Sequence, residues 1–227
     1  CSSDLLVPLN DDRMQAKFVA QRIRDLIEEG TDPNEIAVLY RAHFHSMELQ
    51  MELTRGEIPF RITSGIRFFE QAHIKDVVAF MRFVVNPRDE LSFRRMVMLL
   101  PGIGPGMAQK LWIRWAACPE SRLETPPESF SALMLDFPVP AKSKTAWTQL
   151  CYTLDELAPA GKIAGPASML ISINEAVYDE YMQAAFENYD QRRQDLLHLA
   201  GFSERFESTE DFLSQLSLLG NTDDESA

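Results

Sequence analysis

The hydrophobic pattern of this chain changes at Gly65. Before that glycine, stretches with helical spacing alternate with a short, continuous apolar run at residues 35–40 and a second short strand-like segment at residues 58–62. A β-prone run such as residues 35–40 is typical of a strand that is buried on both faces of a sheet. After Gly65, the apolar residues recur only at helical spacing. The pattern therefore predicts an α/β segment followed by an all-α segment.

The α/β segment has the order strand, helix, strand, helix, strand. An apolar run at residues 5–9 precedes a helix that begins at Asn10-Asp11-Asp12 and ends at Gly30, and a second helix over residues 45–55 ends at Gly56. Alternating strands and helices favour a parallel sheet with right-handed crossovers. Three strands are fewer than a complete doubly wound domain contains, so we expect residues 1–64 to form an incomplete domain.

The all-α segment is expected to cover residues 65–220. Its first helix has an apolar stripe at residues 74–85, its second is capped by Asp89, and its third begins at Pro105. Further helices are expected near residues 143–158, 167–182, 186–200 and 210–219. The last residues, 221–227, are acidic and small, and we expect them to be disordered.

Charge is distributed unevenly along the chain. The formal net charge of −12 argues against a nucleic-acid partner. Residues 61–115, however, carry nine basic and four acidic side chains and lie between two acidic flanks. A basic segment of this kind is consistent with either a phosphate-binding face or an uneven solvated surface.

Several kinds of chemistry are excluded by missing motifs. The three cysteines are far apart and lack ligand spacing, which excludes a structural zinc site and indicates free thiols in a reducing, cytoplasmic compartment. His43 and His45 are interpreted as ordinary polar residues. No apolar run is long enough to span a bilayer, and no GxxxxGK[ST] phosphate loop is present. We therefore expect no membrane contact, metal, cofactor or catalytic residue in this chain.

The sequence Gly102-Ile103-Gly104, followed by Pro105, lies between two predicted helices within the basic segment. Glycines let a phosphate approach the backbone closely, and the N–H groups at the start of the next helix point at the anion, aided by the helix dipole. Ile103 would fix the turn in the core, Lys110 would add a charge contact, and we expect a positive φ at Gly104. The alternative is a connection without a ligand, but its place in the basic segment favours DNA-backbone binding.

Residues 65–76, which join the two segments, form the second candidate site. Arg67 and Lys75 are candidates for DNA contacts. The alternative is that they are solvated or pair with Glu70 and Asp76.

Four sequence blocks occur in the order found in one family of motor proteins. They are Ile36-Ala37-Val38-Leu39-Tyr40-Arg41, Ile58-Pro59-Phe60-Arg61-Ile62, Gly65-Ile66-Arg67-Phe68-Phe69-Glu70 with Ile74-Lys75-Asp76, and Gly102-Ile103-Gly104. With these blocks, the chain resembles UvrD/Rep/PcrA-like superfamily 1 DNA helicases over nearly its whole length.

The resemblance implies a place for each segment. Residues 1–64 would be part of the second RecA-like motor domain (2A), which is of the P-loop NTPase type. Residues 65–220 would be the helical 2B domain inserted into it, with a helix-hairpin-helix-like GIG turn, and residues 221–227 an acidic tail. The Walker motifs would precede Cys1, so the ATP and Mg²⁺ of the parent helicase would bind outside this chain, and the chain alone would be inactive.

The resemblance also implies partners. Gly102-Ile103-Gly104 would touch the duplex backbone ahead of the fork, and Arg41 would lie near the single strand. The parent would be an ATP-dependent 3′–5′ DNA helicase of replication or repair, located in the bacterial cytoplasm at the nucleoid. Its other partners would be the rest of the motor and repair or replication proteins.

The chain departs from the family pattern at two places. Gln71-Ala72-His73 stands where the family usually has Arg-x-Glu, and Ala42-His43-Phe44-His45-Ser46-Met47 stands where it tends to have Thr-Asn-Ala-Gln-Ser-Arg. These departures put the family's DNA contacts at those positions in question. Two other classes stay open: a non-catalytic DNA-binding or protein-interaction module, and the motor of an AddA/RecB-like helicase–nuclease, for which no nuclease carboxylate–lysine cluster is evident.

Overall fold

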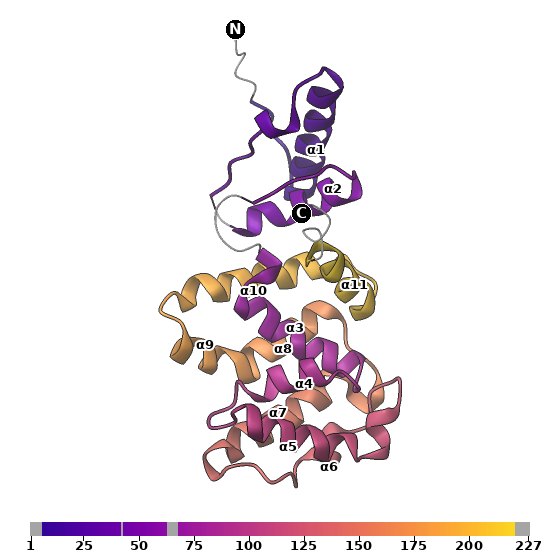
Figure 1. Ribbon diagram of the computed structural model, residues 1–227, viewed down its shortest axis with the longest axis vertical. Helices are drawn as coiled ribbons and strands as arrows, with labels where there is room; N and C mark the ends of the chain where they lie inside the picture. The colour runs from indigo at the N-terminus through magenta and orange to yellow at the C-terminus, as the bar shows by residue number, and fades with distance from the viewer. Residues whose placement is uncertain (1–5, 42, 63–67, 221–227) are drawn as a thin grey trace. The chain divides into compact units, whose positions relative to one another are not determined.

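The computed structural model describes residues 6–41, 43–62 and 68–220. The chain divides into two compact units, an N-terminal one that runs to Phe68 and a helical one that spans Phe69–Leu218 (Figure 1). Arg67 and the tail 221–227 lie outside the described residues. Within the described ranges, no helix has the length and apolar character that crossing a membrane requires.

Two packed helices form the N-terminal unit. Helix α1 (Asp12–Glu28) begins at Asp11, whose carboxylate accepts the N–H of Met14 at 2.7 Å. It ends just before Gly30, which has a φ of +96°. This start and this end confirm the helix predicted from local sequence. Helix α2 (Met47–Arg55) follows a short 3-10 turn and packs against α1. Their shared core consists of Ala20, Ile23, Leu53 and Ile58.

The strands predicted at residues 35–40 and 58–62 are not formed among the described residues, nor is one formed over residues 6–9 of the first apolar run, so the parallel RecA-like sheet is not confirmed. Ile36 is extended, with φ −97° and ψ 125°, but extended backbone becomes a strand only when a neighbouring segment supplies the ladder of hydrogen bonds. None of the described segments does so. Leu39, in the middle of the first run, is 94% exposed. The prediction thus agrees with the extended backbone at Ile36, but Glu35 belongs to a 3-10 turn and the expected strand pairing is not formed.

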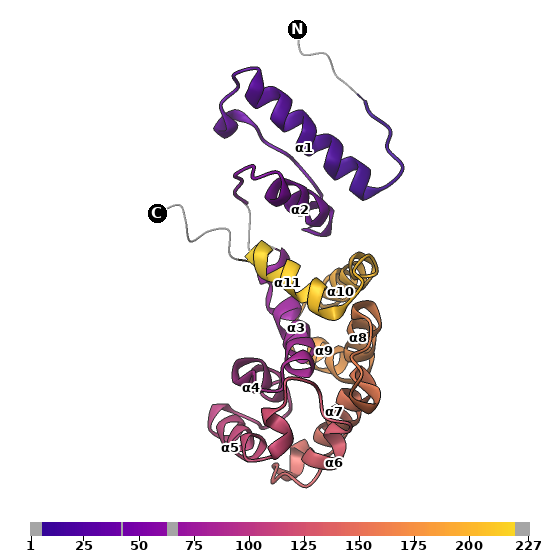
Figure 2. The same ribbon diagram turned by 90° about the vertical axis from the view of Figure 1, so that its right-hand side faces the viewer.

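The second unit is built from helices, as predicted for residues beyond Gly65. They are α3 (Ala72–Val85), α4 (Glu90–Val97), α5 (Pro105–Ala116), α6 (Phe130–Met134), α7 (Lys144–Leu157), α8 (Pro166–Ile173), α9 (Asp179–Ala185), α10 (Tyr189–Ser203) and α11 (Thr209–Gly220). In both views of the unit, α10 and α11 lie at one end, and α5 and α6 lie at the other (Figure 2).

An aromatic cluster holds the α5 end of this unit together. The ring of Phe83 on α3 lies 5.2 Å from that of Phe93, 5.4 Å from that of Trp115 and 5.6 Å from that of Phe130, measured between centroids. The indole N–H of Trp115 donates to the carbonyl of Pro87 at 2.8 Å. These contacts join α3, α4, α5 and α6, so the start of α5 sits on a packed base.

The helix predicted near residues 167–182 is divided in the structure. Helix α8 passes into a π-helical turn (Asn174–Tyr178) before α9 begins. The hydroxyl of Tyr178 donates to Asp76 at 2.7 Å, and Arg95 donates to the same carboxylate at 2.7 Å. Burial and the Asp76 charge raise the pKa of Tyr178, so its hydroxyl stays protonated. The π turn is thereby fixed to α3.

Candidate nucleic-acid interface

The hairpin between α4 and α5 contains the predicted Gly102-Ile103-Gly104 turn. Asp89 caps α4, as predicted, by accepting the N–H of Ser92 at 3.0 Å. Ile103 is only 4% exposed, as its expected place in the core requires, and its N–H donates to the carbonyl of Leu100 at 3.2 Å. The hairpin is therefore anchored by its apolar residue while the glycines on either side are exposed.

The two glycines have different roles, and the expectation of a positive φ at Gly104 is wrong. Gly102 has a φ of +79°, whereas Gly104 has φ −95° and ψ −179°, an extended backbone that any residue adopts. The reversal of the chain is completed at Gly102. Gly104 instead serves as the N-cap of α5, and a side chain added there would meet no atom within 4 Å.

The start of α5 has backbone donors that the helix does not use. No side chain caps it, and Pro105 at its first position has no N–H. The first backbone bond of the helix runs from Ala108 to Gly104 at 2.9 Å, which leaves the N–H groups of Gly106 and Met107 without a role in the helix. Gly106 is exposed, and a Cβ there would meet nothing within 4 Å. An anion can approach this helix start without steric obstruction.

Lys142, which the sequence analysis did not single out, lies against this hairpin. A Cβ built on Gly102 would lie 1.9 Å from Cε and 2.9 Å from Nζ of Lys142, so the lysine side chain occupies the space that glycine leaves. The next residue, Ser143, donates its hydroxyl to the carbonyl of Pro101 at 2.5 Å. This bond holds the segment to the hairpin. Because 40 residues separate Lys142 from Gly102, no local pattern could have identified the contact.

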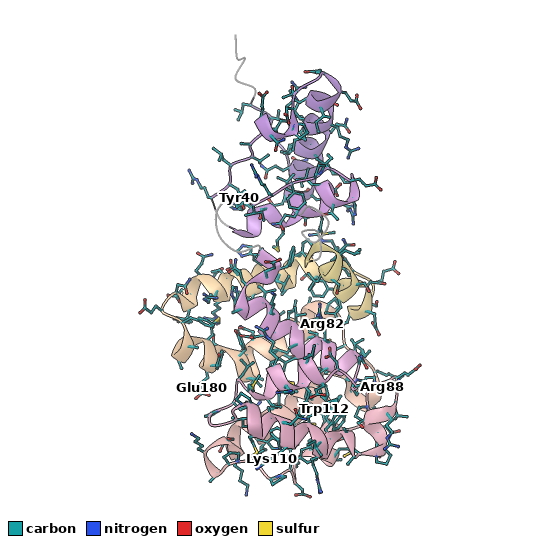
Figure 3. The ribbon with its side chains drawn as sticks, in the orientation of Figure 1. Tyr40, Arg82, Arg88, Lys110, Trp112 and Glu180 are labelled. Atoms are coloured by element: carbon teal, nitrogen blue, oxygen red, sulfur yellow. The ribbon has the colours of Figure 1, made fainter. Side chains whose placement is uncertain are left out.

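Further cations lie on and beside α5. Lys110 is exposed on α5, at the end of the unit away from α10 and α11 (Figure 3). Arg114 is exposed one turn later, with its guanidinium carbon 5.9 Å from the ring centroid of Phe137. Lys144, at the start of α7, is also exposed. Lys142 thus lies beside the open start of α5, whereas Lys110 lies farther along that helix and Arg114 in its last turn.

The remaining predicted site residues are not part of this group. Lys75 is exposed in the first turn of α3, whose opposite end leads to α4, and Arg41 is exposed in the N-terminal unit. Arg67 lies outside the described residues. The structure therefore places Gly102-Ile103-Gly104 at the start of α5 and Lys110 farther along the same helix, and adds Lys142 beside the hairpin.

Several arginines of the basic segment, residues 61–115, bond to partners within the helical unit. Arg88 donates to the backbone carbonyl of Arg122 at 3.0 Å, Arg94 pairs with Glu90 at 3.4 Å, and Arg95 pairs with Asp76 at 2.7 Å. The partners of Asp76 are thus Arg95 and Tyr178, while Lys75 is solvated. The net charge of residues 61–115 consequently does not become a single basic face.

His73, at one departure from the family pattern, is fully buried in helix packing. Its Nδ1 lies 2.8 Å from Nη1 of Arg192, and its Nε2 lies 3.3 Å from Oδ2 of Asp195. Both partners belong to α10. Among the residues that the structure describes, no cluster of His, Cys, Asp or Glu could hold a metal ion. This histidine therefore joins α3 to α10.

Residues 6–121, slightly more than half of the chain, match the family described as UvrD-like helicase C-terminal domain. The chain belongs to this family. The match includes α1 to α5 and the Gly102-Ile103-Gly104 hairpin, and ends before Lys142.

Individual relatives agree with this assignment. DNA helicase II of Haemophilus influenzae is 42% identical over 83 residues, which are 37% of this chain and 11% of that protein. ATP-dependent DNA helicase UvrD1 of Mycobacterium tuberculosis is 40% identical over 85 residues, 37% of this chain and 11% of that protein. ATP-dependent DNA helicase PcrA of Staphylococcus epidermidis is 29% identical over 101 residues, 44% of this chain and 14% of that protein. The chain thus spans a small part of the length of these relatives.

Proposed function

We propose that this chain is the duplex-engaging and regulatory 2B region, with part of motor domain 2A, of an ATP-dependent 3′–5′ DNA helicase. The observation that carries the proposal is the open start of α5. There the N–H groups of Gly106 and Met107 have no role in the helix, and the side chain of Lys142 packs against the adjoining hairpin. Residues 1–64 would contribute part of 2A, and residues 65–220 would form 2B.

The chemistry of the hairpin suits a DNA phosphate. A phosphate oxygen would accept the N–H groups of Gly106 and Met107, and hydrogen bonds to a charged group contribute about 1.5–3 kcal/mol each. Lys142 and Lys110 would add Coulomb attraction from two sides. None of these contacts involves a base edge, so the site would bind duplex DNA of any sequence. A helicase that moves along DNA requires such sequence-independent binding.

Regulation would follow from the movement of 2B relative to the motor that the family resemblance implies. The hairpin can contact the duplex only in those orientations of 2B, relative to the motor, that place the hairpin at the fork. DNA would therefore favour these arrangements by its binding free energy.

ATP and Mg²⁺ would bind elsewhere in the parent helicase, because the residues of this chain do not fit a nucleotide site: no phosphate loop is present. The isolated chain should therefore not hydrolyse ATP. Arg41, Arg67 and Lys75 stay candidates for DNA contacts. We place the parent in the cytoplasm at the nucleoid, in DNA replication or repair, with proteins of those processes as partners.

The salt dependence of duplex binding tests this proposal. Affinity for a short fluorescent duplex, measured by anisotropy, should fall with salt with a log–log slope of about 2–3. Replacing both Lys110 and Lys142 with alanine should weaken binding and lower that slope by about 2.

The matched control removes the same charge elsewhere. Lys17 and Lys162 are exposed, on α1 and in the loop before α8, and their double alanine variant should leave the slope unchanged. Equal losses in the two double variants would show that only net charge matters and would contradict the assignment of the hairpin.

A further inference from the structure

One exposed face of α5 has groups that attract anions at regular intervals. Gly106, Lys110 and Arg114 are four residues apart and exposed, so they share one face of the helix. Four residues advance an α-helix by about 6 Å, which is comparable to the separation of successive phosphates along a nucleic-acid strand. The sequence of α5 contains no acidic residue. This face therefore begins at the open N–H groups of the helix start and continues with two cations.

The two cations on this face have no acidic partner among the described residues. Neither Lys110 nor Arg114 forms an ion pair there. By contrast, Arg94 and Arg95 on the neighbouring helix α4 both pair with carboxylates. The positive charge that ion pairs compensate on α4 is thus left available on α5.

An aromatic ring positions Arg114 without using its hydrogen-bond donors. The guanidinium carbon of Arg114 lies 5.9 Å from the ring centroid of Phe137. That ring is 5% exposed and stacks on Trp147, with 5.9 Å between the centroids. Within the described part of the chain, the guanidinium donates no hydrogen bond. A guanidinium has five N–H donors in a planar fork that fits a phosphate, so those of Arg114 are available to an external anion.

We propose that α5 lies along one strand of the duplex and contacts three successive phosphates of that strand. This inference rests on the proposed DNA-binding function and extends it. The N–H group of Gly106, with Lys142 beside it, binds the first phosphate, Lys110 binds the second and Arg114 binds the third. A helix that crossed a groove from one strand to the other would place its middle cation, Lys110, over the groove, where no phosphate lies. Arg114 is thus a further DNA-contact residue.

Arginine variants of the full chain test the third contact. In anisotropy titrations with a short duplex, Arg114→Ala should lower the log–log salt slope by about 1, the value of one phosphate contact. The affinity of the unmodified chain relative to this variant should then rise about threefold between 0.2 M and 0.05 M salt. Arg114→Lys keeps the charge and should restore the slope. An unchanged slope in Arg114→Ala would overturn the proposal.

The matched control removes an arginine that is not on α5. Arg122 is exposed in the 3-10 turn that follows the helix (Pro119–Arg122), and Arg122→Ala should leave the slope unchanged. Equal losses of slope in Arg122→Ala and Arg114→Ala would show that only the net charge of this end matters and would refute the contact. The melting temperature of each variant should change by less than about 2 °C, because both side chains are exposed.

A duplex with one uncharged strand tests whether α5 follows a single strand. In this probe, one strand has methylphosphonate linkages throughout and the other is ordinary DNA. If all three contacts are to one strand, the charged strand still supplies them, and the salt slope should keep about four-fifths of its value, the ratio of the single-strand and duplex coefficients. If the contacts are divided between the strands, the probe loses at least one of them. The slope should then fall to about half or less, and the proposal would be wrong.

The variants also distinguish failure of this inference from failure of the DNA-binding function. If the double alanine variant of Lys110 and Lys142 lowers the slope and Arg114→Ala does not, the hairpin binds DNA but α5 does not follow a strand. If neither variant changes the slope, the assignment of the hairpin as a DNA-binding site is itself wrong.

Discussion

Replacing Gly104 with aspartate should separate the stability of the helical unit from DNA binding. The backbone at Gly104 accepts any residue, and a new side chain meets no atom within 4 Å. Aspartate is a favoured N-cap and interacts well with the positive end of the helix dipole. The free energy of unfolding should therefore rise by about 0.5–1 kcal/mol.

The same substitution should impair duplex binding. The new carboxylate would accept the N–H of Gly106 or Met107, which removes a donor that the proposed phosphate contact uses. Loss of one hydrogen bond to a charged group costs about 1.5–3 kcal/mol, or roughly 10- to 150-fold in affinity. Repulsion between carboxylate and phosphate adds to this loss.

Gly104→Asn is the matched variant, because it caps the helix without adding charge, and its affinity should lie between those of Gly104→Asp and the unmodified chain. Stability is measured by denaturant unfolding, and affinity by anisotropy with a short duplex. If Gly104→Asp is more stable and binds duplex as well as the unmodified chain, the hairpin is only a connector. Gly102→Ala should behave differently: its φ of +79° makes the substitution destabilising by about 1–2 kcal/mol.

Three further predictions concern other parts of the chain. Lys142→Ala should leave the thermal midpoint unchanged and lower the salt slope of duplex binding by about 1, as titrations at several salt concentrations would show. Tyr178→Phe should lower the free energy of unfolding by about 1–3 kcal/mol, measured with denaturant, because it removes a donor to the buried carboxylate of Asp76; an unchanged midpoint would mean that Arg95 alone satisfies that group. Burial and the charge of Asp155 raise the pKa of Cys151 from 9.0 to about 12, so iodoacetamide at mildly alkaline pH should label this thiol only after unfolding. Because the folded state binds the thiol proton of Cys151 more tightly than the unfolded state does, the contribution of this protonated thiol to the free energy of unfolding should decline between pH values of about 9 and 12.

Local signals in the sequence were sufficient for most helix boundaries. Asp11 and Asp89 cap the helices that were predicted to follow them, and Pro105 begins α5. Each of these signals acts within a few residues of its own position. The predicted all-α character of the segment beyond Gly65 is confirmed for the same reason.

Features that depend on distant residues were not predictable in this way. The strand at residues 35–40 needed a pairing partner that composition does not reveal. The start of α6 combines a local and a distant contact: Ser129 caps it by accepting the N–H of Ala132 at 3.1 Å, and Asp155, 25 residues away, accepts the N–H of Phe130 at 2.5 Å. The serine was a local signal for this short helix, whereas the contact with Asp155 was not visible in the sequence. Lys142 lies against the hairpin only through the packing of a separate turn, so this charge could not be predicted from the motif itself.

The unequal charges of the two ends make the helical unit an electric dipole. The α5 end carries the exposed lysines Lys110, Lys142 and Lys144, and residues 166–218, which include α10 and α11, carry ten acidic side chains against three basic ones. If the hairpin binds DNA as proposed, the field of the polyanion would orient the helical unit before contact, with the hairpin facing the DNA and the acidic end facing away. A larger share of the collisions would then be productive. Raising the salt concentration would shorten the range of this orienting field, so the rate of association should fall together with the affinity.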